Sequence, residues 1–320
     1  MLNPKNYLKI LFTIIFFIGF LAAGYVYDFT KEYPPPITNR ISFDAKLKFI
    51  RDHIDPDTID TIIVGSSIGM NNVLGSVLEK SSTKVKHALN LSVYEATTLE
   101  VEQILELSDA FPNLERIIYS AQYSDFPHAK KYENYDPELL KHFIRKELSP
   151  LALSKLLFNA CNNLLFCQQR EKMWEEKHTQ SNKFTYLGFD HTGSVPLKIY
   201  SKKGVGGRWY LPHPGIMSNE SFNAVARMAQ KAQKKGIKYY VAHQPYREAL
   251  VKKHQSVRNA LKYFDDRIDI IMKKYNGTLI RLQKLHLSDD YHADRSHLND
   301  RGSTIVSQAI GKIIDQTEKK

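Results

Sequence analysis

Cysteine is scarce in this chain: only Cys161 and Cys167 occur among its 320 residues. Neither has a second Cys or His pair nearby, so the sequence holds no cysteine-based metal motif. The two lie six residues apart, which in a regular helix would separate their Cα atoms by roughly 9 Å, too far for a disulfide. We therefore expect two buried free thiols, with a small disulfide loop as the alternative if the segment is not helical.

The sequence also lacks internal repeats, low-complexity tracts and the signatures of nucleic-acid-binding modules. Its formal net charge is +11, from 45 Lys and Arg against 34 Asp and Glu, which favours anionic partners such as phospholipid head groups or phosphate-bearing polymers. The basic residues are spread along the chain, without an arginine-rich tract, zinc-finger spacing or an RNA-binding motif. We therefore expect no nucleic-acid partner.

Charge is absent from residues 10–27, an apolar run near the N-terminus. As a helix this run spans roughly 27 Å, close to the thickness of the hydrocarbon core of a bilayer. Lys5 and Lys9 precede it, which places the N-terminus in the cytoplasm by the positive-inside rule. We expect residues 1–28 to form a cytoplasmic tip and an uncleaved anchor, because the run is long for a signal peptide. A cleaved signal peptide is the alternative, and both export the rest of the chain.

Residues 29–57 are expected to form an extended spacer, stiffened by Pro34-Pro35-Pro36, and a lead-in helix. From residue 58 to residue 320, short β-branched runs alternate with amphipathic segments. Strands are expected at residues 61–64, 85–91, 116–120, 237–242 and 277–282. This alternation predicts an α/β domain with a mostly parallel sheet covered by helices on both faces.

The interval 127–220 interrupts this alternation with helical pieces and a glycine-containing loop region. An insertion of this length is often functional, as a lid or a substrate platform. A structural cap is the alternative, and the sequence does not separate the two. Within it, Arg208-Trp209-Tyr210 and His213 are candidates for contacts with an anionic or sugar acceptor, or for a packed aromatic loop.

Two segments carry side chains suited to nucleophilic catalysis. Gly65-Ser66-Ser67 follows the first expected strand, where the N-terminal amides of the next helix would point at developing negative charge. Asp294 precedes His297 by three residues, so its carboxylate can reach the imidazole within one loop turn. Alone, the first segment fits an N-capped turn and His297 fits a loop histidine bonded to backbone. Both segments are expected at the carboxyl edge of the sheet, where sites of such folds lie.

Together, these segments resemble the SGNH (GDSL-type) hydrolase superfamily over roughly residues 58–126 and 236–316. The family's Gly-Asp-Ser block corresponds to Gly65-Ser66-Ser67, with Ser66 in place of the usual Asp. Its C-terminal Asp-x-x-His block corresponds to Asp294-Arg295-Ser296-His297, followed here by Leu298-Asn299-Asp300-Arg301-Gly302. The substitution at Ser66 is found in membrane-anchored branches of the family that resemble cell-envelope acyl-transfer proteins.

This resemblance implies a three-layer α/β/α, flavodoxin-like fold with Ser67 as nucleophile. It further implies His297 as general base and acid, Asp294 as the carboxylate that orients it, and neither a metal nor another cofactor. The Ser67 amide is one natural oxyanion donor. Glu95 stands where the family usually has a glycine that supplies the second donor. The family's Gly-x-Asn-Asp block is missing, and Gln122 is the best side-chain substitute, with a purely structural polar residue as the alternative.

Two hypotheses follow. In the first, the protein is a serine acyl hydrolase or acyltransferase held by a single span in a bacterial cytoplasmic membrane, with its globular domain outside the cytoplasm. It would act on an O-acyl group of a cell-envelope glycan or a lipid-linked anionic polymer, with a membrane acyl-donor protein as a further partner. In the second, it is a non-catalytic envelope assembly or binding protein on the same fold, as the altered oxyanion blocks suggest.

Overall fold

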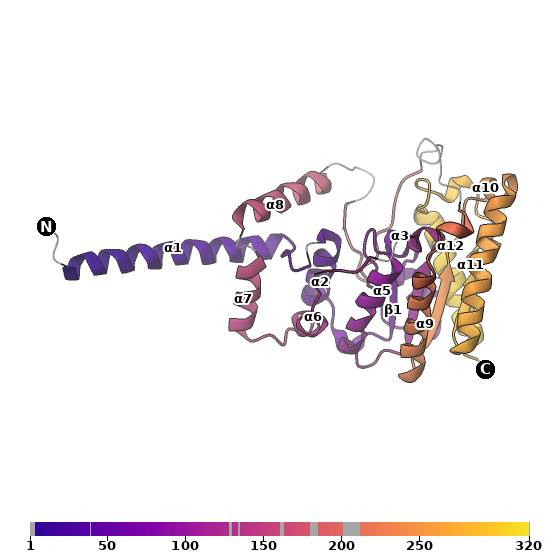
Figure 1. The fold of residues 1–320 in the computed structure, drawn as a ribbon, viewed down its shortest axis with the longest axis horizontal. Helices are drawn as coiled ribbons and strands as arrows, with labels where there is room; N and C mark the ends of the chain where they lie inside the picture. Colours follow the sequence, from indigo (N-terminus) through magenta and orange to yellow (C-terminus); the bar gives the residue numbers. More distant parts are fainter. Residues whose placement is uncertain are drawn as a thin grey trace.

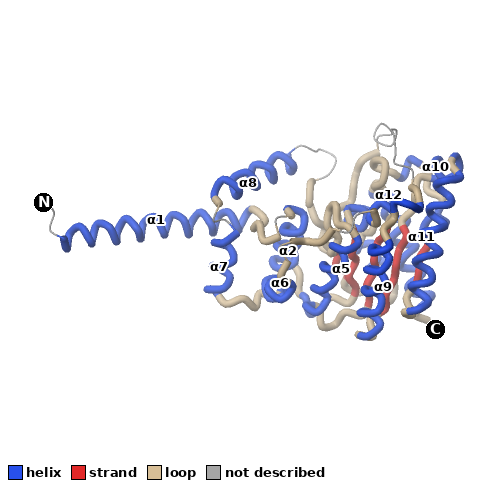
Figure 2. The backbone as a smooth tube through the Cα atoms, viewed as in Figure 1, coloured by secondary structure: helices blue, strands red, loops and turns tan. Residues whose placement is uncertain are grey.

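A parallel β-sheet forms the centre of the folded part of the chain (Figures 1 and 2). The computed structural model describes residues 4–38, 40–127, 130–133, 135–160, 163–179, 185–200 and 212–319. The five strands lie in the order β2-β1-β3-β4-β5, the order of doubly wound, flavodoxin-like sheets. In chain order they are β1 (Thr61–Gly65), β2 (Ala88–Asn90), β3 (Arg116–Ala121), β4 (Lys238–His243) and β5 (Thr278–Arg281).

Helices cover both faces of this sheet because alternate strand residues point to opposite sides. Ile62 and Tyr119 pack into one apolar cluster, whereas Ile63 and Ile118 pack into another. The first face carries α5 (Thr98–Ile104), α9 (Asn219–Lys234) and α11 (Gln255–Lys274); the second carries α3 (Ser67–Asn72), α4 (Gly75–Ser81) and α12 (Asp300–Thr317). The expected α/β architecture with helices on both faces is therefore confirmed.

The second strand is shorter than the expected 85–91, for a reason visible in its hydrogen bonds. The backbone N–H groups of Lys86 and His87 donate to the Asp60 carboxylate, each at 2.9 Å. The Val85 N–H donates to the Ser82 hydroxyl at 3.3 Å. These amides are bonded to side chains, so the parallel ladder begins only at Ala88.

The insertion supplies three helices beside the domain, α6 (Pro137–Ile144), α7 (Pro150–Ala160) and α8 (Leu164–Thr179). The α6 helix packs against α2 (Ile41–His53), and residues 185–200 return to the domain, where Val195 and Leu197 pack with Met70 of α3. Short helical turns complete the described chain: α10 (Glu248–Lys253), Pro56–Thr58, Leu105–Ala110, Tyr123–Asp125, Pro214–Ile216, Leu282–Leu285 and Asp289–Tyr291.

The N-terminal helix α1 (Pro4–Glu32) projects away from the folded part (Figure 1). Its apolar window has a mean hydropathy of 2.2, and none of that window is buried. By length and composition the helix can cross a membrane, and a signal sequence has the same properties.

Two details near this helix differ from the sequence-based expectations. The α1 helix continues to Glu32, and Pro34, Pro35 and Pro36 are buried, so they pack against the protein instead of forming a free spacer. The expectation of free thiols is wrong, because Cys167 is disulfide-bonded. Cys167 belongs to α8, which begins at Leu164. Cys161, the chain's only other cysteine, lies outside the described residues.

Candidate active site

Ser67 lies at the tight turn between β1 and α3. β1 ends at Gly65, and the Ser66 hydroxyl caps α3 by accepting a hydrogen bond from the Ile68 N–H at 3.3 Å. A Cβ atom at Gly65 would lie 2.6 Å from the Ser120 carbonyl oxygen of β3, so only glycine lets the two strands approach this closely. Ser67 is the first helical residue, and its hydroxyl therefore sits at the carboxyl edge of the sheet.

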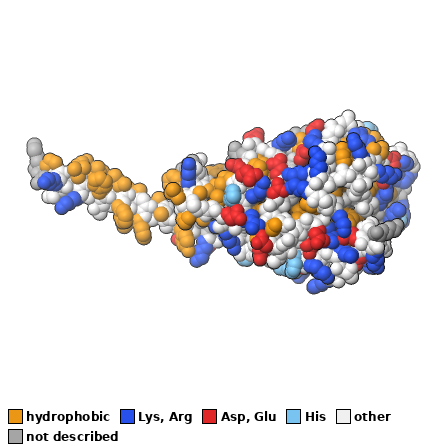
Figure 3. All heavy atoms as spheres, turned by 90° about the horizontal axis from the view of Figure 1, so that it is seen from below, with side chains coloured by type: hydrophobic (Ala, Val, Ile, Leu, Met, Phe, Trp, Pro, Cys, Tyr) orange, Lys and Arg blue, Asp and Glu red, His pale blue; other side chains and the backbone are white. Residues whose placement is uncertain are grey.

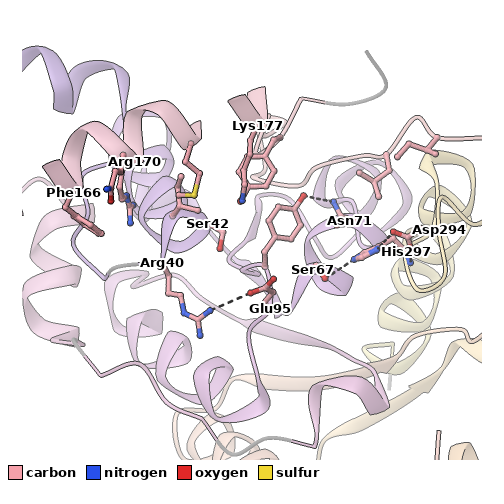
Figure 4. Close-up of a pocket in the computed structure, with 17 residues that line it drawn as sticks. Arg40, Ser42, Ser67, Asn71, Glu95, Phe166, Arg170, Lys177, Asp294 and His297 are labelled. Carbon is pink, nitrogen blue, oxygen red and sulfur yellow. Dashed lines mark hydrogen bonds and ion pairs between the residues drawn. The ribbon is translucent and has the colours of Figure 1, made fainter. Parts of the chain in front are cut away.

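Ser67, His297 and Asp294 form a continuous chain of hydrogen bonds (Figure 4). The Ser67 Oγ atom lies 2.8 Å from His297 Nε2, and His297 Nδ1 lies 2.8 Å from Asp294 Oδ2. A carboxylate on Nδ1 keeps the proton on that nitrogen, so Nε2 accepts from the serine hydroxyl. This is the arrangement that serine acyl-transfer enzymes use to activate a nucleophile.

The Asp294 carboxylate is held ionised by its surroundings. Burial alone would raise its pKa, but the hydrogen bonds and charge of His297 outweigh that effect and lower the pKa to about 2. The backbone N–H groups of Ser296 and His297 also donate to Asp294 Oδ1, at 2.8 and 2.9 Å. Asp294 can therefore stabilise a positively charged His297 at neutral pH.

A buried asparagine on α3 joins the His297 loop to the serine helix. The Leu298 N–H donates to Asn72 Oδ1 at 2.8 Å, directly after His297. Asn299 then caps α12, with its Oδ1 accepting from the Gly302 N–H at 3.1 Å. Sequence reasoning missed Asn72, although two adjacent asparagines one turn beyond Ser67 are unusual in an otherwise apolar helix and could have drawn attention to it.

Glu95 adopts a backbone conformation that favours glycine, with φ of 61°. This explains why a glycine would suit the position better. Its carboxylate is exposed and points toward Arg40, with 3.8 Å between Oε2 and the guanidinium nitrogen (Figure 4). Within the described part of the chain, neither the Glu95 N–H nor the Ser67 N–H donates a hydrogen bond. Both amides are therefore available to a substrate oxygen.

Gln122 is not among the described residues that line the two cavities beside Ser67. Its side chain is buried, and its Oε1 accepts from the Ser124 hydroxyl at 3.2 Å. These contacts favour the structural alternative for Gln122.

Asp125, which sequence reasoning did not single out, lies behind the serine turn. Burial raises its pKa to about 7, against hydrogen bonds from the Ser66 hydroxyl and the Gln122 N–H that lower it. Asp125 belongs to the short helical turn Tyr123–Asp125 that follows β3, so a carboxyl group from a neighbouring strand connection lies behind the serine turn. No motif in the sequence near Ser66 marks this pairing.

The Ser67 hydroxyl opens into a cavity of about 720 Å³ between the sheet edge and α8 (Figure 4). Asp294, His297 and Ser67 line one end. The remaining lining combines cationic and aromatic side chains, among them Arg40, Tyr94, Phe166, Arg170, Lys177 and Tyr186. A second cavity of about 180 Å³ lies on the other side of Ser67, beside Ser124 and Asp125. The site thus has one large and one small compartment around Ser67.

The structure places only one of the remaining sequence candidates, His213. Arg208-Trp209-Tyr210 falls outside the described residues. His213 is exposed and accepts a hydrogen bond from the Gly215 N–H at its own turn. Among the described residues, no group of three or more His, Cys, Asp or Glu could hold a metal ion.

Comparison with family models and with curated proteins finds no relative of this chain. No family model matches the chain, and no curated protein matches it. The assignment of a function therefore rests on the geometry of Ser67, His297 and Asp294 and of the cavity beside them.

Proposed function

We propose that the protein is a membrane-anchored serine acyl hydrolase or acyltransferase of the SGNH type. The observation that carries this proposal is the hydrogen-bond chain from Ser67 through His297 to Asp294, at the mouth of the large cavity. The strand order and the positions of the two motifs, after β1 and before α12, support the SGNH assignment. The substrate would be an O-acylated cell-envelope glycan or lipid-linked anionic polymer.

The proposed reaction proceeds through an acyl-enzyme. Ser67 Oγ attacks the ester carbonyl while its proton moves to His297 Nε2, and Asp294 stabilises the imidazolium. The backbone N–H groups of Ser67 and Glu95 are the candidate donors to the oxyanion. His297 then gives its proton to the departing alcohol. Water or a sugar hydroxyl attacks the acyl-Ser67 ester, loses a proton to His297 and regenerates the serine.

The proposed substrate class follows from the cavity lining and the predicted location. Arg40, Lys177 and the stacked rings of Tyr94 and Tyr186 suit an anionic polymer that contains sugars. The apolar α1 helix supports membrane attachment, and Lys5 and Lys9 before its apolar run favour a domain outside the cytoplasm. The disulfide at Cys167 supports an oxidising compartment, where such bonds persist.

A fluorophosphonate probe on the detergent-purified full chain tests the nucleophile. We expect covalent labelling that is lost in Ser67→Ala and retained in Ser76→Ala, a serine of α4 that bonds Asp190 away from the site. Turnover of an activated ester with and without a glycan acceptor then separates hydrolysis from transfer. Labelling of Ser67→Ala at the wild-type rate would contradict the proposal.

The second candidate is a non-catalytic envelope binding protein on the same fold. It is favoured by the position of Gln122, which leaves the family's side-chain oxyanion donor unreplaced among the described lining residues. A complete absence of labelling across detergents and pH values would support this candidate.

A further inference from the structure

The base of α8 meets α1 where the apolar run of α1 ends. Phe29 and Cys167 are buried together, with Tyr25, Val26 and Tyr33 packed around them. The Tyr33 hydroxyl donates to Glu175 of α8 at 2.9 Å. Since the charge-free run ends at residue 27, these contacts lie at the level where α1 would leave the hydrocarbon core.

The α7 helix lies at the same level and crosses the direction of α1 (Figure 1). None of its residues is buried. Leu151 and Phe158, two turns apart on one face, are 81% and 59% exposed, and Leu165 at the start of α8 is 71% exposed. Figure 3 shows hydrophobic side chains continuing from the projecting helix onto the adjoining end of the folded part.

We propose that α7 and the start of α8 rest in the outer interface of the bilayer that holds α1. Leu151, Phe158 and Leu165 would enter the upper acyl-chain region, and Lys155, exposed on the same helix, would reach the head groups. The occupant is lipid because this apolar surface is continuous with the membrane-crossing run and lies at the depth where that run ends. The inference depends on α1 being an uncleaved anchor, and it does not depend on the chemistry of Ser67.

This second attachment has a consequence for the active site. One helix alone would let the domain rotate and tilt freely on the membrane. With α7 also on the bilayer, α8 is fixed, and Phe166, Arg170 and Lys177 of α8 line the large cavity. The cavity would then face the membrane surface at a constant height, as a lipid-linked substrate requires.

The test uses the full chain in phosphatidylcholine and phosphatidylglycerol vesicles whose lipids carry bromine at shallow acyl positions. Phe158→Trp places a reporter on the proposed surface. Ile270→Trp is the matched control, because Ile270 is also apolar and 66% exposed but lies on α11, away from α7. The unsubstituted chain, with its own two tryptophans, supplies the background emission.

We expect the added Phe158→Trp emission to shift to shorter wavelength and to be quenched at least twofold more than that of Ile270→Trp. Equal quenching of both variants would overturn the proposal. A blue shift that occurs without bromine quenching and that changes with the protein-to-lipid ratio would show that a second copy of the chain covers this surface. That result would also overturn the proposal. Leu165→Trp repeats the test if Phe158→Trp fails to fold by circular dichroism. Fluorophosphonate labelling of the same samples reports separately on the proposed function.

Discussion

At the scale of single residues, the turn before α3 brings together side chains from separate segments. The Ser66 hydroxyl caps α3, and Asp125, in the short helical turn after β3, lies close enough to Ser66 for that hydroxyl to lower its pKa. Ser67, the next residue, is directed at His297. Residues of β1, α3 and the segment after β3 therefore meet at this turn.

Glu95 holds a left-handed backbone conformation that favours glycine, and this gives a direct prediction. Replacing it with glycine, Glu95→Gly, relieves the left-handed conformation at φ 61°. We expect the free energy of unfolding of Glu95→Gly to be about 1 kcal/mol larger than that of Glu95→Ala, which keeps the strained conformation. Chemical denaturation of both variants measures the difference.

The comparison with alanine isolates the backbone effect, because both variants remove the same carboxylate and its contact with Arg40. If the two variants unfold at the same free energy, the left-handed conformation at position 95 is not a source of strain. Ester turnover should be retained in both, since only the Glu95 N–H is proposed to touch the substrate.

At the scale of elements, the alignment of His297 with Ser67 depends on a link between α3 and the loop before α12. Asn72 Oδ1 accepts the Leu298 N–H, whereas the Asn72 Nδ2 atom has no partner among the described residues. Replacing the side chain, Asn72→Leu, would leave the buried Leu298 N–H unpaired, which costs about 1–3 kcal/mol. We expect a lower melting temperature and a loss of kcat of at least tenfold, because His297 moves away from Ser67.

A control for this variant is available on α12. Ser303→Ala removes a buried hydroxyl that donates to the carbonyl of the N-cap residue Asn299 at 2.9 Å. It should lower the melting temperature with little effect on kcat. If Asn72→Leu lost stability but kept full kcat, the link would be structural and would not position His297.

The sequence pattern predicts the bounds of a strand well where its backbone amides pair with neighbouring strands. It predicts them less well where side chains bind those amides instead. The β-branched runs at β1, β3, β4 and β5 lie within a residue or two of their expected bounds. The second strand is shorter because Asp60 and Ser82 bind the amides of residues 85–87. Asp60 is distant in sequence from those amides, so a local pattern cannot reveal the competition.

At the scale of the whole molecule, the two motif segments were predictable and the walls of the cavity were not. Parallel strands bring their carboxyl ends to one edge, so Ser67 and His297 could be placed together from chain order alone. Part of the cavity wall comes from α2 and α8, whose contact joins residues 126 positions apart. Helical periodicity gives the faces of these elements but not the partner of a buried charge.

The ion pair between Arg170 of α8 and Asp44 of α2 gives a prediction at this scale. Both side chains are buried, and their closest atoms are 2.7 Å apart. Burial raises the pKa of Asp44 to about 6, while Arg170 and Thr38 lower it. Removing the cation, Arg170→Met, leaves a buried carboxylate unpaired, so we expect a loss of about 3–5 kcal/mol in unfolding free energy at pH 8.

The sign of the pH dependence follows from the same carboxyl group. Its pKa in the folded state is above its value of 3.8 when exposed, so its ionisation weakens the fold as pH rises through that interval. Without Arg170 the folded pKa rises further, and a protonated Asp44 is tolerated at low pH. The stability deficit of Arg170→Met should therefore be smaller at pH 5 than at pH 8 in urea unfolding. The double variant Asp44→Asn/Arg170→Met should recover stability at pH 8. If the deficit of Arg170→Met does not change with pH and the double variant recovers nothing, the packing of the Arg170 side chain, and not its charge, holds α8 against the domain.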